Sequence, residues 1–153
     1  MLEKDSRLTA KQIAAALGRE EADVQGQIAK YEADHVIMKY TALVDYDKLD
    51  VDSVTALIEV KISPQKGDGY DRIAQRIYQY DEVESLYLMT GAYDLLVTMN
   101  ARTVKDAAQF VYEHLAAMEG VTSTATHFIM KKYKEKYCLF DKELEQEERL
   151  LFV

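Results

Sequence analysis

The residues best suited to chemistry surround one glycine turn, Gly91-Ala92. Two apolar runs that alternate with period two, residues 83–90 and 93–100, are separated by these two residues alone. Glycine at the first position of a two-residue connection is typical of a type II′ β-hairpin, because only glycine adopts the positive φ there without strain. Asp94 follows one residue into the returning strand, where its carboxylate requires water or a cationic partner.

This turn carries groups that would bind a small zwitterion such as an amino acid. Exposed backbone N–H groups at a glycine turn bind carboxylates, and the Asp94 carboxylate would accept an ammonium group. A plain turn with a solvated aspartate explains the same residues equally well. We expect hydroxyl groups to complete the pocket at a subunit junction, so the candidate effector residues are Gly91, Ala92 and Asp94 with Thr90, Thr122, Ser123, Thr124 and Thr126.

Other chemistry finds little support in the sequence. The three histidines, His35, His114 and His127, have no metal-ligand spacing to one another or to the single cysteine, Cys138. No nucleophile elbow, P-loop or dinucleotide-binding glycine turn is present. We therefore expect no metal, no cofactor and no catalytic residue. A single cysteine excludes an intrachain disulfide and fits a reducing compartment.

The composition narrows the class of protein. The 153 residues carry a net charge of −8, which argues against a general polyanion binder, although a local basic patch would still bind nucleic acid. No apolar run approaches the roughly 20 residues that span a bilayer, and the charged start of the chain shows no signal-peptide pattern. We expect a cytoplasmic protein without a membrane partner.

The first part of the chain predicts two helices. One covers residues 9–17, with Thr9 as the N-cap and Gly18 closing the C-terminus. The second covers residues 20–34 and begins with acidic residues, which favour the positive end of a helix. Two short helices joined by a glycine turn make a helix-turn-helix candidate, although many helical hairpins share this pattern. Residues 40–46 then alternate as in a strand.

From residue 54 the pattern is strand, helix, strand, strand, helix, strand. This order predicts an α+β fold, a ferredoxin-like βαββαβ unit with four antiparallel strands and both helices on one face. The last strand is expected over residues 121–133. The second helix is capped by Thr103, and its inward residues are predicted to be Val104, Ala107, Ala108, Val111, Leu115 and Met118.

Two helices can cover only one face of such a sheet, yet apolar residues occur at both strand parities. Tyr87 and Leu96, for example, alternate with Leu86 and Leu95. A second apolar face favours a further layer, and another copy of the sheet would supply it. We therefore expect a homodimer through the sheets. Exposure at the sheet edge is the alternative explanation.

Taken together, these features resemble the Lrp/AsnC (feast/famine) transcription regulators. The resemblance covers nearly the whole chain and lies in the combination of short motifs. The first motif is Leu8-Thr9-Ala10-Lys11-Gln12-Ile13-Ala14, with Gly18 and Val24 beyond it. The others are Val36-Ile37 with Tyr40-Thr41-Ala42, Thr90-Gly91-Ala92-Tyr93-Asp94, and Gly120-Val121-Thr122.

The resemblance implies an N-terminal helix-turn-helix that binds DNA and a C-terminal domain that binds a small effector, commonly an amino acid. It implies dimers that join through their sheets and assemble into octamers. The implied domains are a winged-helix-like unit at 1–37, a linker strand and turn at 38–53, the effector and oligomerisation domain at 54–133, and a tail at 134–153. It also adds Tyr93 to the candidate effector residues.

The DNA-binding candidates are Arg7, Lys11, Arg19, Gln25, Gln27 and Lys30. Two departures weaken this assignment. Only the last turn of a first helix is seen, at residues 2–5. Residues 19–34 carry two basic side chains against five acidic ones, a net charge of −3, whereas phosphate contacts need Lys and Arg. The alternatives are an effector-binding and oligomerisation partner with weak or no DNA binding of its own, and a dimeric ferredoxin-like barrel enzyme.

Overall fold

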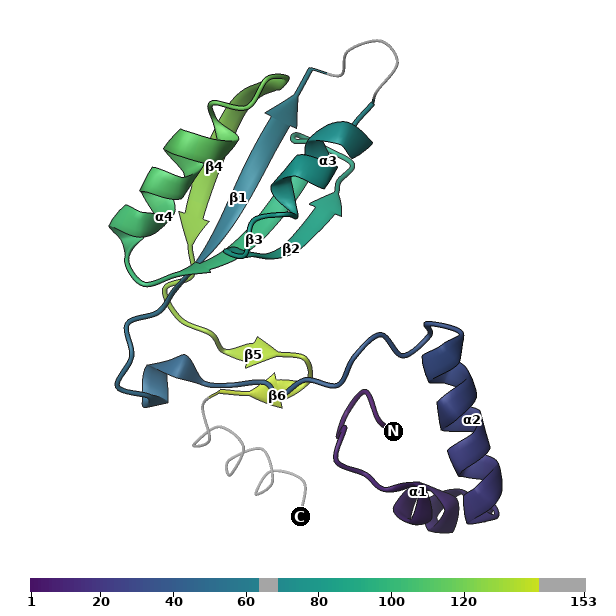
Figure 1. The fold of residues 1–153 in the computed structure, drawn as a ribbon. Coiled ribbons are helices and arrows are strands. Elements are labelled where there is room, and N and C mark those ends of the chain that lie inside the picture. The colour runs from purple at the N-terminus through teal and green to yellow at the C-terminus, as the bar shows by residue number, and fades with distance from the viewer. Residues whose placement is uncertain (64–68, 141–153) are drawn as a thin grey trace. The chain divides into compact units, whose positions relative to one another are not determined.

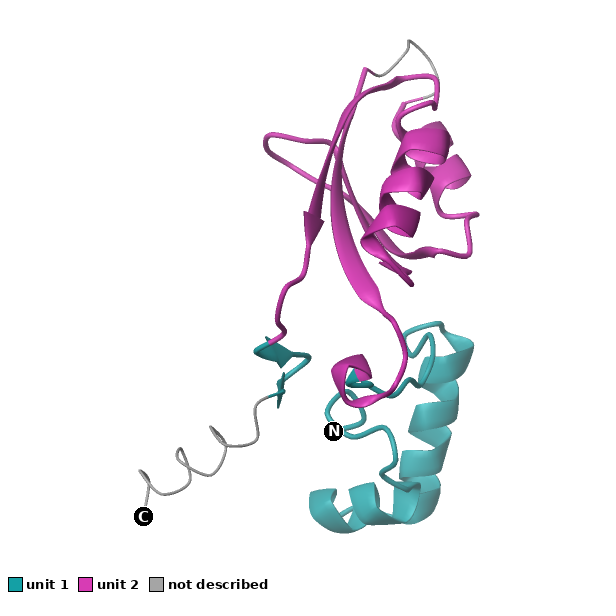
Figure 2. Cartoon of the chain, turned by 90° about the vertical axis from the view of Figure 1, so that its left-hand side faces the viewer, with its two compact units in different colours: residues 1–45, 133–153 teal, residues 46–132 magenta. Residues whose placement is uncertain are grey.

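The chain forms two compact units. A computed structural model describes residues 1–63 and 69–140. Unit 1 comprises Met1–Asp45 and Tyr133–Val153, and unit 2 comprises Tyr46–Lys132 (Figure 2). None of the helices in the described residues is long and apolar enough to cross a membrane.

Unit 1 contains both predicted N-terminal helices, α1 (Ala10–Leu17) and α2 (Glu21–Ala33). Thr9 caps α1 through a capping box in which its hydroxyl accepts from the Gln12 N–H at 3.2 Å. Gly18 ends the helix with φ at +64°. Both predicted helices are confirmed to within one residue, and they pack around a small buried cluster of Ile13, Ala14 and Val24.

The strand predicted over residues 40–46 is wrong, because no ladder forms there. Residues 40–45 are irregular, the 3-10 helix η1 (Tyr46–Lys48) begins at Tyr46, and apolar side chains of the segment such as Tyr40, 47% exposed, lie open to solvent. Alternation alone does not make a strand without a neighbouring strand to pair with. Unit 1 also holds a short hairpin that the sequence analysis did not predict, β5 (Lys134–Glu135) and β6 (Cys138–Leu139).

Unit 2 is the predicted ferredoxin-like fold (Figure 1). The strands are β1 (Val54–Ile62), β2 (Val83–Leu88), β3 (Leu95–Ala101) and β4 (Val121–Phe128), antiparallel in the order β2-β3-β1-β4. Helices α3 (Asp71–Ile77) and α4 (Val104–Phe110) lie on one face, and α4 continues through a π-helical turn, η2 (Val111–Leu115). The last strand ends at Phe128 rather than at residue 133, because its partner β1 begins at Val54.

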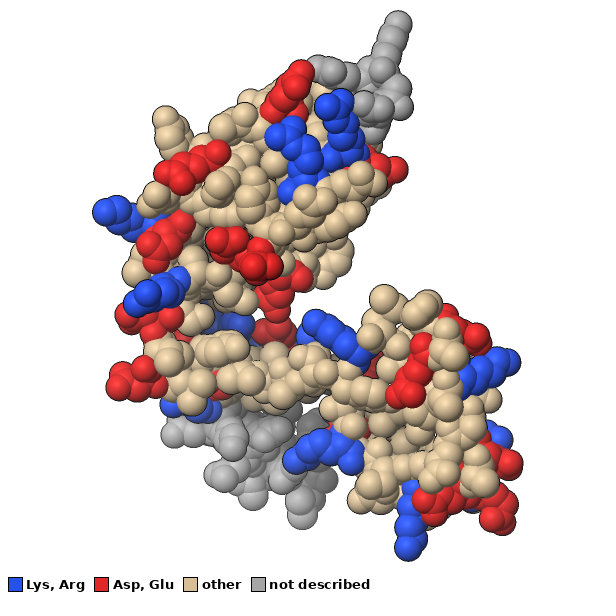
Figure 3. Space-filling model, in the orientation of Figure 1, with Lys and Arg blue, Asp and Glu red and all other residues tan. Residues whose placement is uncertain are grey.

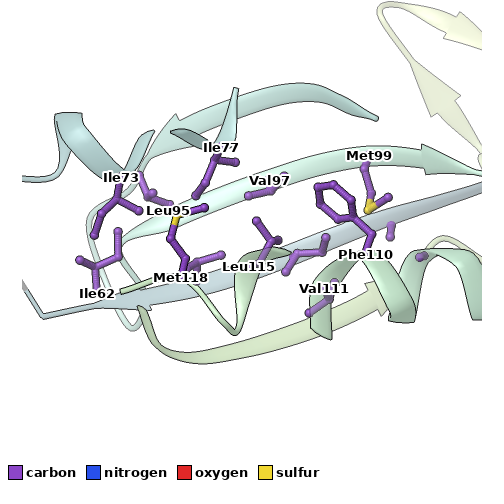
Figure 4. Packing of buried hydrophobic residues seen from close by; sticks show 14 residues of the cluster. Ile62, Ile73, Ile77, Leu95, Val97, Met99, Phe110, Val111, Leu115 and Met118 are labelled. Carbon is purple, nitrogen blue, oxygen red and sulfur yellow. The ribbon is translucent and has the colours of Figure 1, made fainter. Parts of the chain in front are cut away.

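The core lies between the helices and one face of the sheet (Figure 4). Alternate residues of β1 face it, because successive side chains of a strand point to opposite faces. Two inward predictions for the second helix are wrong: Val104 and Ala108 are exposed, and Phe110 is buried instead. The buried stripe is Ala107, Phe110, Val111, Leu115 and Met118.

The other face of the sheet carries no helix (Figure 2), and we call it the open face. The cross-strand register places Leu57 and Glu59 of β1 on this face, with Leu96 and Thr98 of β3 opposite them. Tyr87 of β2 joins them, because it pairs with Leu96. The two parities of apolar residues thus correspond to two faces, of which only one is covered within the described chain.

Candidate effector site and DNA interface

The predicted glycine turn lies at the end of the sheet where β1 and β2 finish and β3 and β4 begin. The prediction of a two-residue hairpin connection is wrong. The Met89 N–H donates to the Asp94 carbonyl at 2.8 Å, so residues 90–93 form a four-residue loop. Gly91 has φ at +133°, a conformation that side-chain-bearing residues rarely adopt, so the glycine is required even though the turn is not type II′.

The loop is longer than predicted because Asp94 bonds to β1. Its N–H donates to the Val60 carbonyl at 3.0 Å, and its Oδ2 accepts the Ile62 N–H at 2.7 Å. The half-buried carboxylate therefore has a backbone amide as its partner, rather than the water or cation that the sequence suggested. Among the described residues, the other oxygen, Oδ1, accepts no hydrogen bond.

Thr122 approaches the same point from the other neighbouring strand. The pairing of β1 with β4 shifts between Lys61 and Ile62, which leaves Thr122 as the extra residue of a β-bulge. Its hydroxyl donates to the Lys61 carbonyl at 3.2 Å. Lys61 C=O and Ile62 N–H belong to one peptide group, so Asp94 and Thr122 hold its two ends from opposite sides. We call this arrangement the peptide clamp.

The predicted effector residues divide into two groups. Thr90, Gly91 and Ala92 are exposed on the loop, Tyr93 is half-buried, and Ser123 pairs with Lys61 near the clamp. Thr124 and Thr126 do not join them. They pair with Val60 and Ile58, two buried residues, and therefore lie on the helix-covered face of β4. The structure brings only Asp94 and Thr122 onto a shared partner.

Sequence reasoning missed that partner, the Lys61–Ile62 peptide. The contact from Ile62 to Asp94 spans 32 positions, and the one from Thr122 to Lys61 spans 61. No local pattern signals such contacts. A groove of about 330 Å³ lies between α3 and β2, and none of the predicted effector residues lines it.

The predicted DNA-binding residues lie on unit 1, most of them exposed. Lys11 is on α1, Arg19 follows Gly18 and Lys30 is near the end of α2. Arg7 is engaged by Asp5, with Nε to Oδ1 at 3.0 Å and Nη2 to Oδ2 at 3.2 Å. These hydrogen bonds from Arg7 lower the pKa of Asp5 and raise that of Arg7.

The two glutamines are also constrained. The Gln25 side chain donates to Glu21 Oε1 at 3.2 Å, and Gln27 is half-buried. Acidic and basic side chains alternate over the visible surface of unit 1 without a continuous basic patch (Figure 3). The described residues contain no group of three or more His, Cys, Asp or Glu side chains that could hold a metal ion.

Comparison with known proteins identifies the family. Residues 55–139 match the model of the Lrp/AsnC ligand binding domain. The HTH-type transcriptional regulator YugG of Bacillus subtilis is 42% identical over 142 residues, which cover 92% of this chain and 86% of YugG. These names describe regulators rather than enzymes, as the sequence predicted.

Solved structures show the same fold. The crystal structure of PH0061 superposes with a TM-score of 0.76 at 24% identity and covers 88% of both chains. The transcriptional regulator NMB0573 of Neisseria meningitidis, solved as an L-Met complex, has a TM-score of 0.73 at 22% identity, covering 88% of this chain and 86% of that one. Family match and fold agree, and the chain belongs to the Lrp/AsnC family of transcriptional regulators.

Proposed function

We propose that the protein binds DNA through α1 and α2 as a helix-turn-helix and senses an amino acid or a related metabolite at the loop of residues 90–94. The family match, the names of the relatives and the L-Met complex of a regulator with the same fold support this proposal. We also propose a cytoplasmic location, as expected of a transcriptional regulator of this family.

The observation that carries the effector assignment is the geometry of Asp94. One carboxylate oxygen is fixed by the Ile62 N–H, which orients the side chain, and the other has no partner among the described residues. An ammonium group would bind Oδ1 as a charge-assisted hydrogen bond. The Gly91 and Ala92 N–H groups donate to no described residue, so they are available to a carboxylate. Thr90 adds a hydroxyl beside them.

We further propose that a homodimer forms through the open faces and that dimers assemble further, up to an octamer. The loop is exposed on a single copy, so the remaining walls of the effector pocket come from another copy. The open face supports the dimer because it holds Leu57, Leu96 and Tyr87 without a covering layer.

A thermal-shift screen of the twenty amino acids tests the effector site, since a ligand that binds the folded state raises Tm by mass action. We expect one or a few amino acids to raise the Tm of the wild type. Asp94→Asn keeps an oxygen that accepts the Ile62 N–H but removes the charge, so it should fold normally and lose the response. Asp71→Asn, at an exposed position of α3, is the matched control and should respond like the wild type.

An Asp94→Asn variant that responds like the wild type would refute the ammonium role of this carboxylate. If no amino acid shifts the wild type, the effector belongs to another chemical class. Asp94→Ala is a poorer probe, because it also removes the hydrogen bond to Ile62.

A second function, an effector-binding partner that joins mixed oligomers and does not bind DNA itself, is favoured by the charges of unit 1. Residues 19–34 carry a net charge of −3, from two basic and five acidic side chains, and Asp5 holds Arg7. A gel-shift salt titration separates the two functions. A DNA-binding regulator shows affinity that falls steeply with salt, whereas the partner shows none near physiological salt.

A further inference from the structure

A carboxylate and an imidazole lie side by side on the open face. His127 Nε2 of β4 is 3.4 Å from Glu59 Oε1 of β1. Glu59 pairs with Ala125 and His127 with Leu57, so the two side chains are diagonal neighbours, which long side chains can bridge. Their side chains are 35% and 58% exposed in the single copy. The pair is therefore partly hydrated and open to a covering layer.

The surroundings of Glu59 are largely apolar. β1 is one of the two inner strands of the sheet, and the cross-strand neighbours of Glu59 are Leu96 on β3 and Ala125 on β4. Within the four strands, the other charged or titratable side chains on this face are Lys61 two residues along β1, Tyr87 on β2 and Glu84 at the β2 bulge. Asp94, which comes directly before β3 with the parity of Leu96, adds a carboxylate at the Lys61 end. The Glu84 carboxylate accepts from Asn100 at 3.0 Å. The face of β3 adds no titratable side chain, and both helices lie on the opposite face.

Covering this face with a second sheet removes water from Glu59. A carboxylate that loses water without a counter-charge opposes association, whereas a protonated His127 cancels its charge. Histidine changes charge between about pH 5 and 8. Each copy carries both members of the pair on its open face. A two-fold symmetric interface between two open faces therefore contains two Glu59–His127 pairs, one from each copy. Dimerisation then takes up protons.

We propose that the Glu59–His127 pair makes the joining of two open faces pH-dependent, so that the dimer tightens as His127 becomes protonated. This inference rests on the proposed sheet-to-sheet dimer. Sedimentation velocity of the full chain at pH 8.0 and pH 6.0, at constant ionic strength, measures it. We expect the dimer Kd to be several-fold lower at pH 6.0 than at pH 8.0, because the covered Glu59 carboxylate of each copy then has a counter-charge beside it.

Two variants test the pair itself. His127→Gln should lose the pH response and dimerise at pH 6.0 as weakly as the wild type does at pH 8.0. Glu59→Gln removes the carboxylate charge, so it should dimerise more tightly than the wild type at pH 8.0 and should not tighten further at pH 6.0, where a protonated His127 would lack its counter-charge. His35→Asn in unit 1 is the control and should keep the wild-type response; asparagine tolerates the positive φ of 55° at this position.

The outcomes separate this inference from the proposed dimer. A wild-type dimer with equal Kd at both pH values overturns the pH switch, as does a pH response that survives in His127→Gln. A chain that stays monomeric at every concentration and pH contradicts the sheet-to-sheet dimer and the switch together.

Discussion

The carboxylate of Asp94 accepts the Ile62 N–H, and the hydroxyl of Thr122 donates to the Lys61 carbonyl. These two bonds satisfy one peptide group at a bulge, where the regular ladder is interrupted. An aspartate is a poor strand former, and its place beside β3 follows from this long-range partner. A ligand on Oδ1 would therefore act on a side chain that is already fastened to an inner strand.

At Thr122 we predict a measurable loss of stability when the clamp is broken. Thr122→Val keeps the shape and removes the hydroxyl donor, so the free energy of unfolding should fall by about 1 kcal/mol. Thr122→Ser retains the donor and should stay close to the wild type. Urea denaturation of both variants measures the difference. Equal stability of Val and Ser variants would show that the hydroxyl does not support the bulge.

Asp5 is predicted to limit DNA binding by holding Arg7. The hydrogen bonds from Arg7 lower the pKa of Asp5, so the pair persists at neutral pH and is lost only as pH falls through that lowered pKa in the acid range. Asp5→Asn should release Arg7 and raise DNA affinity several-fold at neutral pH. The affinity should also depend more steeply on salt, by the amount expected for about one further phosphate contact.

Fluorescence anisotropy at several salt concentrations measures this effect. Glu3→Gln, which changes the net charge equally at an exposed residue nearby, is the control and should change affinity less. If Glu3→Gln raises the affinity and the salt slope as much as Asp5→Asn, the effect is one of net charge and Arg7 makes no phosphate contact.

At the scale of elements, local signals predicted most of the fold. Capping residues located the starts of α1 and α4, since Thr9 and Thr103 both form capping boxes. The element order and period-two patterns gave the βαββαβ sheet. The wrong predictions concern features that depend on partners distant in the sequence. Hydrogen bonds to β1 lengthen the hairpin loop, and the strand expected at residues 40–46 has no partner strand. The nine effector candidates do not all lie together, because the strand register places Thr124 and Thr126 on the helix-covered face of β4.

Replacing two glycines by alanine should change the stability of the protein in opposite directions. Gly120 has φ at +92°, and an added Cβ would lie 2.8 Å from Cδ1 of the buried Ile73. Gly120→Ala should therefore lower the free energy of unfolding by about 2 kcal/mol.

Gly26 lies inside α2 with open space around it, so Gly26→Ala should raise the free energy of unfolding by up to about 1 kcal/mol. Urea denaturation checks both signs, and a stabilising Gly120→Ala would contradict the packing described here.

At the scale of the whole molecule, the proposed effector loop lies in unit 2 and the proposed DNA-binding helices lie in unit 1. The effector changes DNA binding only if it has different affinities for two arrangements of the assembly. A single copy exposes both the loop and the open face. We therefore expect the regulatory state to be a property of the proposed oligomer.

The most direct test of this account is the effect of the effector on DNA affinity. DNA selected by the protein from a random pool is titrated by fluorescence anisotropy, with and without the amino acid that raises Tm. We predict that the amino acid changes the Kd of the wild type for this DNA at least about fivefold and leaves that of Asp94→Asn unchanged. A chain that selects no DNA at low salt, or a wild-type Kd that the amino acid does not alter, would contradict the proposed function.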